Sequence, residues 1–206
     1  EHWKIYLFTM LISFVSVVPF IIYAEVKRRM KRVFLGCVAL LLIAEIVLWG
    51  SGPHFWELVA GVQLFFLAFN LMEALLPSLI SKESPAGYKG TAMGIYSTSQ
   101  FIGVAIGGAL GGWVDGMFDS QTVFLAGALL ATVWLLVAST MKEPRYVSSL
   151  RVEIPHDVEV SESLKQRLEA KEGVSEVLLV PEERSLYVKI DSKVTNRFEV
   201  EQALKA

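Results

Sequence analysis

The amino-acid sequence predicts an α-helical membrane part followed by a small α+β domain. Of its 206 residues 53% are hydrophobic, and the mean hydropathy of +0.49 is too high for an ordinary soluble protein. The first 144 residues carry only 9 basic and 9 acidic side chains, whereas the remaining 62 carry 10 basic and 12 acidic. The two parts are therefore suited to two solvents, a bilayer and water.

Five apolar segments are long enough to cross a membrane as helices. A bilayer core takes about 20 residues of helix at ~1.5 Å of rise per residue. The segments run over residues 3–24, 33–49, 55–80, 91–114 and 121–141. This pattern predicts five membrane-spanning helices and makes the lipid bilayer the first expected partner.

The positions of Lys and Arg predict the orientation of these helices. Five basic residues lie in the first connection, between 27 and 32, two lie in the third, at Lys82 and Lys89, and Lys142 and Arg145 follow the last helix. The other two connections hold none, and only Lys4 counts against the pattern. Basic loops stay on the cytoplasmic side. We therefore expect a periplasmic N-terminus for this sequence, a cytoplasmic C-terminal domain and further helices upstream.

The residues after 144 predict a soluble domain with the order βαββα. Alternation marks strands over 150–154, 176–180 and 185–190, with residues 181–184 connecting the last two. Ser161 is expected to cap a helix that presents Leu164 and Leu168, and Thr195 or Asn196 to cap the final helix. The predicted boundaries are therefore 1–144 for the membrane part and 145–206 for the domain.

The sequence excludes several functional classes. Cys37 is a single cysteine in an apolar run, and the three histidines are scattered, so no metal site or disulfide framework is predicted. There is no phosphate-binding loop and no nucleophile elbow, and neither part has a single-sign charge. We expect no enzyme activity, no cofactor and no nucleic-acid partner.

Glu73 is the leading candidate for a functional residue because a carboxyl group inside a bilayer is costly. On the third helix it shares one face with Gln63 and Asn70, within roughly 80° of arc. Burial disfavours the charged form of a carboxyl, so Glu73 is expected to bind and release a proton. The competing interpretation is a structural hydrogen bond to a neighbouring helix.

Polar side chains on two other helices extend this candidate site. The fourth helix carries Tyr96 and Ser99 in its cytoplasmic half, and the first carries Ser13. We expect these residues to line a polar cavity. The fourth helix also carries Gly103, Gly107 and Gly111, a spacing that lets two helix backbones approach closely.

The first connection carries a motif that resembles a family loop. Glu25 followed by Arg28, Arg29 and Arg32 resembles the motif that major facilitator transporters place between the second and third helices of each six-helix half. Residues 90–94 and 103–108 of the fourth helix are similar to the eleventh helix of the drug/proton antiporters of that superfamily. The resemblance implies helices 8–12 of a twelve-helix fold, with Glu25 and the three arginines as a cytoplasmic gate. A basic loop required only for topology is the alternative.

The C-terminal part resembles the ferredoxin-like, heavy-metal-associated fold through residues 173–177 and 195–203. That family binds metal through a Cys-x-x-Cys pair, and this sequence has His156, Asp157 and Glu159 in the corresponding loop. We therefore expect no metal in this domain.

Together the resemblances imply a secondary transporter of the bacterial inner membrane. They imply proton-coupled export of small molecules or drugs by alternating access, with a regulatory or stabilising cytoplasmic domain. The expected partners are the substrate, protons and the N-terminal helices of the same protein, within a monomer. The alternative is a membrane-anchored sensor or binding protein whose soluble tail binds an ion or a partner.

Overall fold

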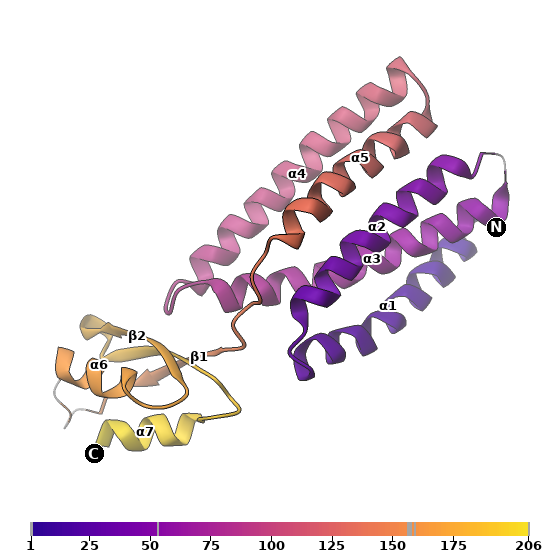
Figure 1. The fold of residues 1–206 in the computed structure, drawn as a ribbon. Coiled ribbons are helices and arrows are strands. Elements are labelled where there is room, and N and C mark those ends of the chain that lie inside the picture. Colours follow the sequence, from indigo (N-terminus) through magenta and orange to yellow (C-terminus); the bar gives the residue numbers. More distant parts are fainter. Residues whose placement is uncertain (1, 53, 156–157, 159, 206) are drawn as a thin grey trace. The chain divides into compact units, whose positions relative to one another are not determined.

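The structure is a computed structural model that describes residues 2–52, 54–155, 158 and 160–205. Five long helices precede a small domain with the predicted order βαββα (Figure 1). The chain divides into two compact units, Glu1–Leu79 with Ser97–Pro144 and Ile80–Tyr96 with Arg145–Ala206. The connection between the third and fourth helices therefore belongs to the same unit as the C-terminal domain.

The five predicted helices are confirmed; the first four have slightly wider limits than predicted, and the fifth ends two residues earlier. Their bounds are α1 His2–Val26, α2 Met30–Gly50, α3 Phe55–Glu83, α4 Lys89–Met117 and α5 Ser120–Ser139. Among the described residues, α2, α3 and α5 are long and apolar enough to span a membrane, and α1 has a shorter apolar stretch, Met10–Val26. At 29 residues α4 has the length. It falls short in hydropathy because glycines and the polar run 96–100 dilute its apolar residues.

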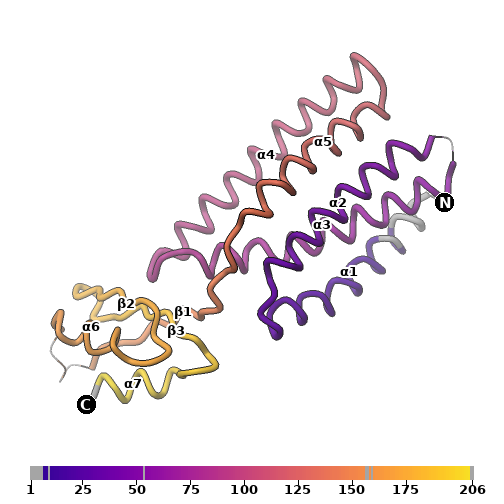
Figure 2. The backbone as a smooth tube through the Cα atoms, in the orientation of Figure 1, coloured from indigo at the N-terminus to yellow at the C-terminus, as the bar shows by residue number. Residues whose placement is uncertain are grey.

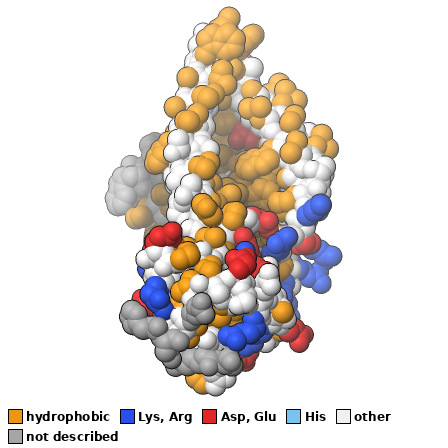
Figure 3. Space-filling model, turned by 90° about the vertical axis from the view of Figure 1, so that its left-hand side faces the viewer, with side chains coloured by type: hydrophobic (Ala, Val, Ile, Leu, Met, Phe, Trp, Pro, Cys, Tyr) orange, Lys and Arg blue, Asp and Glu red, His pale blue; other side chains and the backbone are white. Residues whose placement is uncertain are grey.

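Within the helical unit, α2 packs along α5. The rings of Phe34 and Trp134 meet edge to face with centroids 6.0 Å apart. None of the described residues of α4 is buried, and large hydrophobic side chains are exposed along α1, α4 and α5. Hydrophobic side chains also cover much of the surface drawn in Figure 3. This exposure suits helices that face lipid or other helices.

Specific backbone and side-chain contacts explain where α1 ends and where α5 begins. Arg28 has a φ of 51°, in the left-handed region, and lets the Arg29 backbone N–H donate to the Ala24 carbonyl oxygen at 3.0 Å. This arrangement ends α1. At the start of α5, the Asp119 carboxylate accepts from the Thr122 backbone N–H and hydroxyl, both at 2.7 Å. These bonds lower the pKa of Asp119 and cap the helix.

The C-terminal domain contains a three-stranded antiparallel sheet in the order β1-β3-β2. The backbone trace in Figure 2 shows the sheet with its two helices. The elements are β1 Ser148–Glu153, α6 Glu162–Glu169, β2 Val174–Val180, the short 3-10 helix η1 Pro181–Glu183, β3 Ser185–Ile190 and α7 Arg197–Lys205. The central strand is β3, and its antiparallel pairing with β2 confirms the predicted hairpin.

The domain forms a hydrophobic core of its own, and α6 and α7 contribute to this core from one face of the sheet. The buried set contains Val152, Ile154, Leu164, Leu168, Val177, Leu186, Val188, Ile190, Val200 and Leu204. The predicted cap of α6 is confirmed, because the Leu164 backbone N–H donates to Ser161 Oγ at 3.4 Å. Of the two candidates for α7, Asn196 is the cap, accepting from the Glu199 backbone N–H at 3.0 Å.

Candidate functional site

Glu73 lies opposite a polar side chain of the neighbouring helix. Gln100 of α4 donates its amide Nε2–H to Glu73 Oε1, with 2.5 Å between the two heavy atoms. Within this chain Glu73 is exposed, where the sequence led us to expect burial, and Gln100 is half-buried. The burial of a helix residue depends on which neighbouring helices cover it, and the sequence pattern of α3 does not place those neighbours. Periodicity on α3 therefore could not predict this exposure. The contact joins α3 to α4 within the helical unit.

The rest of the predicted polar face of α3 has different partners. Gln63 donates its amide to Ser13 Oγ of α1 at 2.7 Å, and Ser13 is fully buried. Asn70 lies between them on α3 and is half-buried. The structure thus brings Ser13 to Gln63 and Gln100 to Glu73, so α3 has a polar contact with the helix on each side.

The two other predicted polar residues of α4 belong to different compact units. Tyr96 is half-buried and falls in the unit of the C-terminal domain, whereas Ser99 is exposed and falls in the helical unit. Gln100 was not among the leading candidates from sequence. The only signal that could have selected it is its membership of the same polar run.

The residues of the predicted gate lie around the turn between α1 and α2. The Glu25 carboxylate accepts from Ser78 Oγ of α3 at 2.8 Å, and Arg28 has the left-handed backbone of the turn. Arg29 and Arg32 are exposed. Glu25 therefore connects the C-terminal end of α1 to α3, a contact that the motif alone did not predict.

The glycines of α4 do not pack as the sequence predicted within this chain. A Cβ built at Gly103 or Gly107 would meet nothing within 4 Å, and one at Gly111 would lie 3.9 Å from Val123 of α5. Close approach occurs instead at Gly61, whose added Cβ would lie 2.7 Å from the side chain of Leu48. Sequence reasoning missed Gly61 because it is isolated and forms no small-xxx-small pair.

A cavity of about 700 Å³ lies between α1, α2 and α3. Pro19 and Tyr23 of α1 line it together with Arg32 and Gly36 of α2, and most of the remaining wall is apolar. Neither Glu73 nor Gln63 belongs to its lining. The cavity is therefore separate from the polar contacts of α3.

The described residues contain no group of three or more His, Cys, Asp or Glu side chains that could hold a metal ion. The loop residues His156, Asp157 and Glu159 lie outside the described residues.

The sequence matches a known protein along its whole length. It is 74% identical over 205 residues to the inner membrane transport protein YajR of Escherichia coli K12, a match that covers all of this chain and 45% of that protein. The chain is a close homologue of this transport protein. Residues 150–206 match the family described as the YajR YAM domain. The chain thus spans less than half of the length of this relative.

More distant relatives carry related names. An uncharacterized transporter of Buchnera aphidicola is 37% identical over 52% of this chain and 27% of its own length. An uncharacterized MFS-type transporter of Pseudomonas aeruginosa is 29% identical over 52% of this chain and 26% of its own length. The predicted resemblance to major facilitator transporters, with the small C-terminal domain, is confirmed, and the named relatives are transporters and not enzymes.

Proposed function

We propose that the full-length protein is a secondary transporter that exports small molecules or drugs across the bacterial inner membrane in exchange for protons. The present helices are the eighth to twelfth of twelve, the C-terminal domain is cytoplasmic, and the protein acts as a monomer. The named relatives support the transporter class. The observation that carries proton coupling is the Glu73–Gln100 contact between two long helices of the apolar unit.

Glu73 has the chemistry of a proton carrier. As a carboxylate it is acceptor-only and takes the hydrogen bond that the Gln100 amide donates. Once protonated it gains a donor of its own, and the Gln100 amide can accept through its oxygen after rotating. Protonation therefore exchanges donor and acceptor across the α3–α4 contact. Alternating access requires a change of this kind, one that favours a different helix arrangement in each protonation state.

The test uses the full-length protein in sealed vesicles with an imposed pH gradient. Lipophilic cations are added and the movement of protons is followed for wild type, Glu73→Gln and a control, Glu45→Gln. Glu45 is a half-buried carboxylate of α2 that lies against Gly127 of α5. We expect wild type and Glu45→Gln to dissipate the gradient and Glu73→Gln to leave it intact. Equal dissipation by all three would make Glu73 structural.

The gate is tested without changing the number of basic residues. Glu25→Gln keeps every Lys and Arg in the connection, so topology is preserved, and weakens the bond from Ser78 Oγ. We expect slower transport at an unchanged protein level. Unchanged transport in Glu25→Gln would leave the arginines with a topological role alone.

The alternative function, a membrane-anchored sensor, would place the activity in the C-terminal domain. The YajR YAM family match establishes that a distinct domain is present but not what it binds. Calorimetry with Zn²⁺ on the full-length protein separates the two proposals, because the transporter proposal predicts no tight binding. Tight binding that persists in Glu73→Gln would favour the sensor.

A further inference from the structure

The sheet of the C-terminal domain has two faces, and only one faces the domain core. Successive side chains of a strand point to opposite faces. On β3, Leu186, Val188 and Ile190 enter the core, so Tyr187 and Lys189 lie on the other face. Lys189 is nevertheless only 4% exposed. A segment outside the domain core must therefore cover this face.

The covering segment is residues 82–90, which comprise the end of α3, the residues between the two helices and the start of α4. We call it the α3–α4 connection, and it belongs to the same compact unit as the domain. The Lys189 ammonium donates to the carbonyl oxygen of Lys82 at 2.6 Å and also to that of Ser84. Lys82 is in the last turn of α3, where carbonyl groups lack intrahelical partners and a cation is favoured. Lys189 thus caps the C-terminus of α3 from the sheet.

Next to Lys189, Gly87 of the connection packs closely against the sheet. A Cβ built at Gly87, which has a φ of 81°, would collide with Leu178 of β2 and contact the Tyr187 ring of β3. Ser84 and Ala86 are buried as well. Gly87 is therefore suited to the sheet in two ways, through its backbone conformation and through its lack of a side chain.

The segment that leads into the domain makes two further contacts with the same connection. Glu83 accepts from the Arg145 backbone N–H at 3.1 Å. The Lys82 ammonium lies 6.0 Å from the centroid of the Tyr146 ring, within cation–π range. The connection is thus held by the sheet and by the segment before it.

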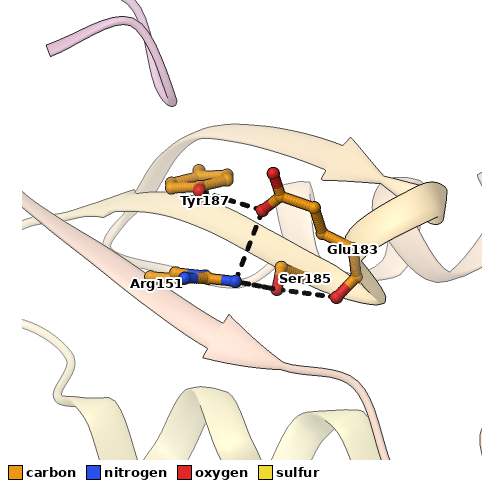
Figure 4. Close-up of polar contacts among 4 residues, drawn as sticks. All are labelled: Arg151, Glu183, Ser185 and Tyr187. Atoms are coloured by element: carbon orange, nitrogen blue, oxygen red, sulfur yellow. Dashed lines mark hydrogen bonds and ion pairs between the residues drawn. The ribbon is translucent and has the colours of Figure 1, made fainter. Parts of the chain in front are cut away.

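Tyr187 also belongs to a polar cluster on the open face (Figure 4). Its hydroxyl donates to the Glu183 carboxylate, which also pairs with Arg151 of β1, both at 3.3 Å. A small cavity of about 250 Å³ is lined by Arg151 and Tyr187 of the sheet and by Gly87, Lys89 and Gly90 of the connection. The cluster therefore fixes side chains that line the docking face.

Charge makes this contact specific. Burial lowers the pKa of Lys189, opposed by the carboxylates of Glu176 and Glu83 and reinforced by Arg145. An apolar side chain would cover the same surface without the desolvation cost of an ammonium group. The carbonyl acceptors at the end of α3 give the lysine a function that an apolar residue could not supply.

We propose that the open face of the sheet is a docking surface for the α3–α4 connection, and that the C-terminal domain clamps this connection through Lys189. Because α3 carries Glu73 and α4 carries Gln100, the clamp restrains the cytoplasmic ends of both helices of the candidate site. The clamp does not depend on what the protein transports or on whether protons are coupled.

Hydrogen exchange on the full-length protein in lipid nanodiscs tests the clamp. Lys189→Met removes the two donated bonds with a side chain of similar length, and Lys193→Met is the control, because Lys193 is an exposed lysine of the same domain. We expect exchange of the amides within 81–90 to rise at least about tenfold in Lys189→Met and to stay at the wild-type rate in Lys193→Met.

Peptides from β2 and α6 provide the folding check. Their protection should be unchanged in Lys189→Met, since the core on the other face of the sheet remains intact. If those peptides lose protection, Lys189→Gln and Lys189→Arg are compared instead. The clamp then requires that the amides within 81–90 exchange faster in Lys189→Gln and not in Lys189→Arg. Wild-type exchange over 81–90 in a folded Lys189→Met, or equal acceleration in Lys193→Met, would overturn the proposal.

Discussion

The C-terminal domain and the helical unit bury their apolar residues in different ways. The domain gathers ten residues from its sheet and two helices into one core. The helical unit leaves large apolar side chains exposed along α1, α4 and α5, and the described residues of α4 include no buried one. The domain therefore has an apolar core of its own, whereas the helices present apolar surface that a lipid bilayer can cover.

The test with the largest expected effect makes the same substitution, Leu to Ala, in each region. Leu168 of α6 is fully buried in the domain core, and Leu130 of α5 is 68% exposed. Leu168→Ala should lower the free energy of unfolding of the domain by about 2–5 kcal/mol, because it removes apolar contacts and leaves a cavity. Leu130→Ala should change stability by less than about 0.5 kcal/mol. Exchange of the β3 amides measures the first effect, and thermal unfolding of the full-length protein measures the second.

A second test asks whether the helical unit has any close packing of its own. An added Cβ at Gly61 would lie 2.7 Å from the Leu48 side chain, whereas one at Gly36 would meet nothing within 4 Å. Gly61→Ala should therefore destabilise the helices by about 1–3 kcal/mol through overpacking. Gly36→Ala should be neutral or stabilising, since alanine favours helix. Equal thermal midpoints for the two variants would mean that α2 and α3 do not meet at Gly61.

The sequence was sufficient to predict elements whose signal is local. Hydropathy located five helices, and alternation located three strands. Residue type identified Ser161 as one cap and left Thr195 and Asn196 as the two candidates for the other. Contacts between residues that are far apart in the sequence could not be predicted. The Glu73–Gln100 contact depends on how two helices face one another. The burial of Lys189 depends on a connection more than 100 residues earlier.

A smaller effect is expected at the cap of α7. The side chain of Asn196 accepts from the Glu199 backbone N–H at 3.0 Å. Asn196→Ala should cost about 1 kcal/mol, and Asn196→Asp should retain the cap. The matched control is Ser192→Ala, an exposed position just before the cap. Exchange of the α7 amides should rise in the alanine variant alone, and faster exchange in Ser192→Ala as well would assign the effect to the loop.

The smallest expected effect is the pH response of the cap that begins α5. Hydrogen bonds from Thr122 lower the pKa of Asp119 below its ordinary value of 3.8. The folded state therefore binds this proton less readily than the unfolded state does. The contribution of Asp119 to stability is fully present above pH 3.8 and is lost as the pH falls through the folded-state pKa.

Asp119→Asn isolates this titration because the amide oxygen still accepts the Thr122 bonds but does not ionise. We expect the thermal midpoint of wild type to fall relative to that of the asparagine variant only below pH 3.8. The effect should also be local to the first turn of α5, since Asp119 is exposed and its bonds are confined to that turn. A constant difference between the two midpoints across this pH range would mean that the charge of Asp119 adds nothing to the cap.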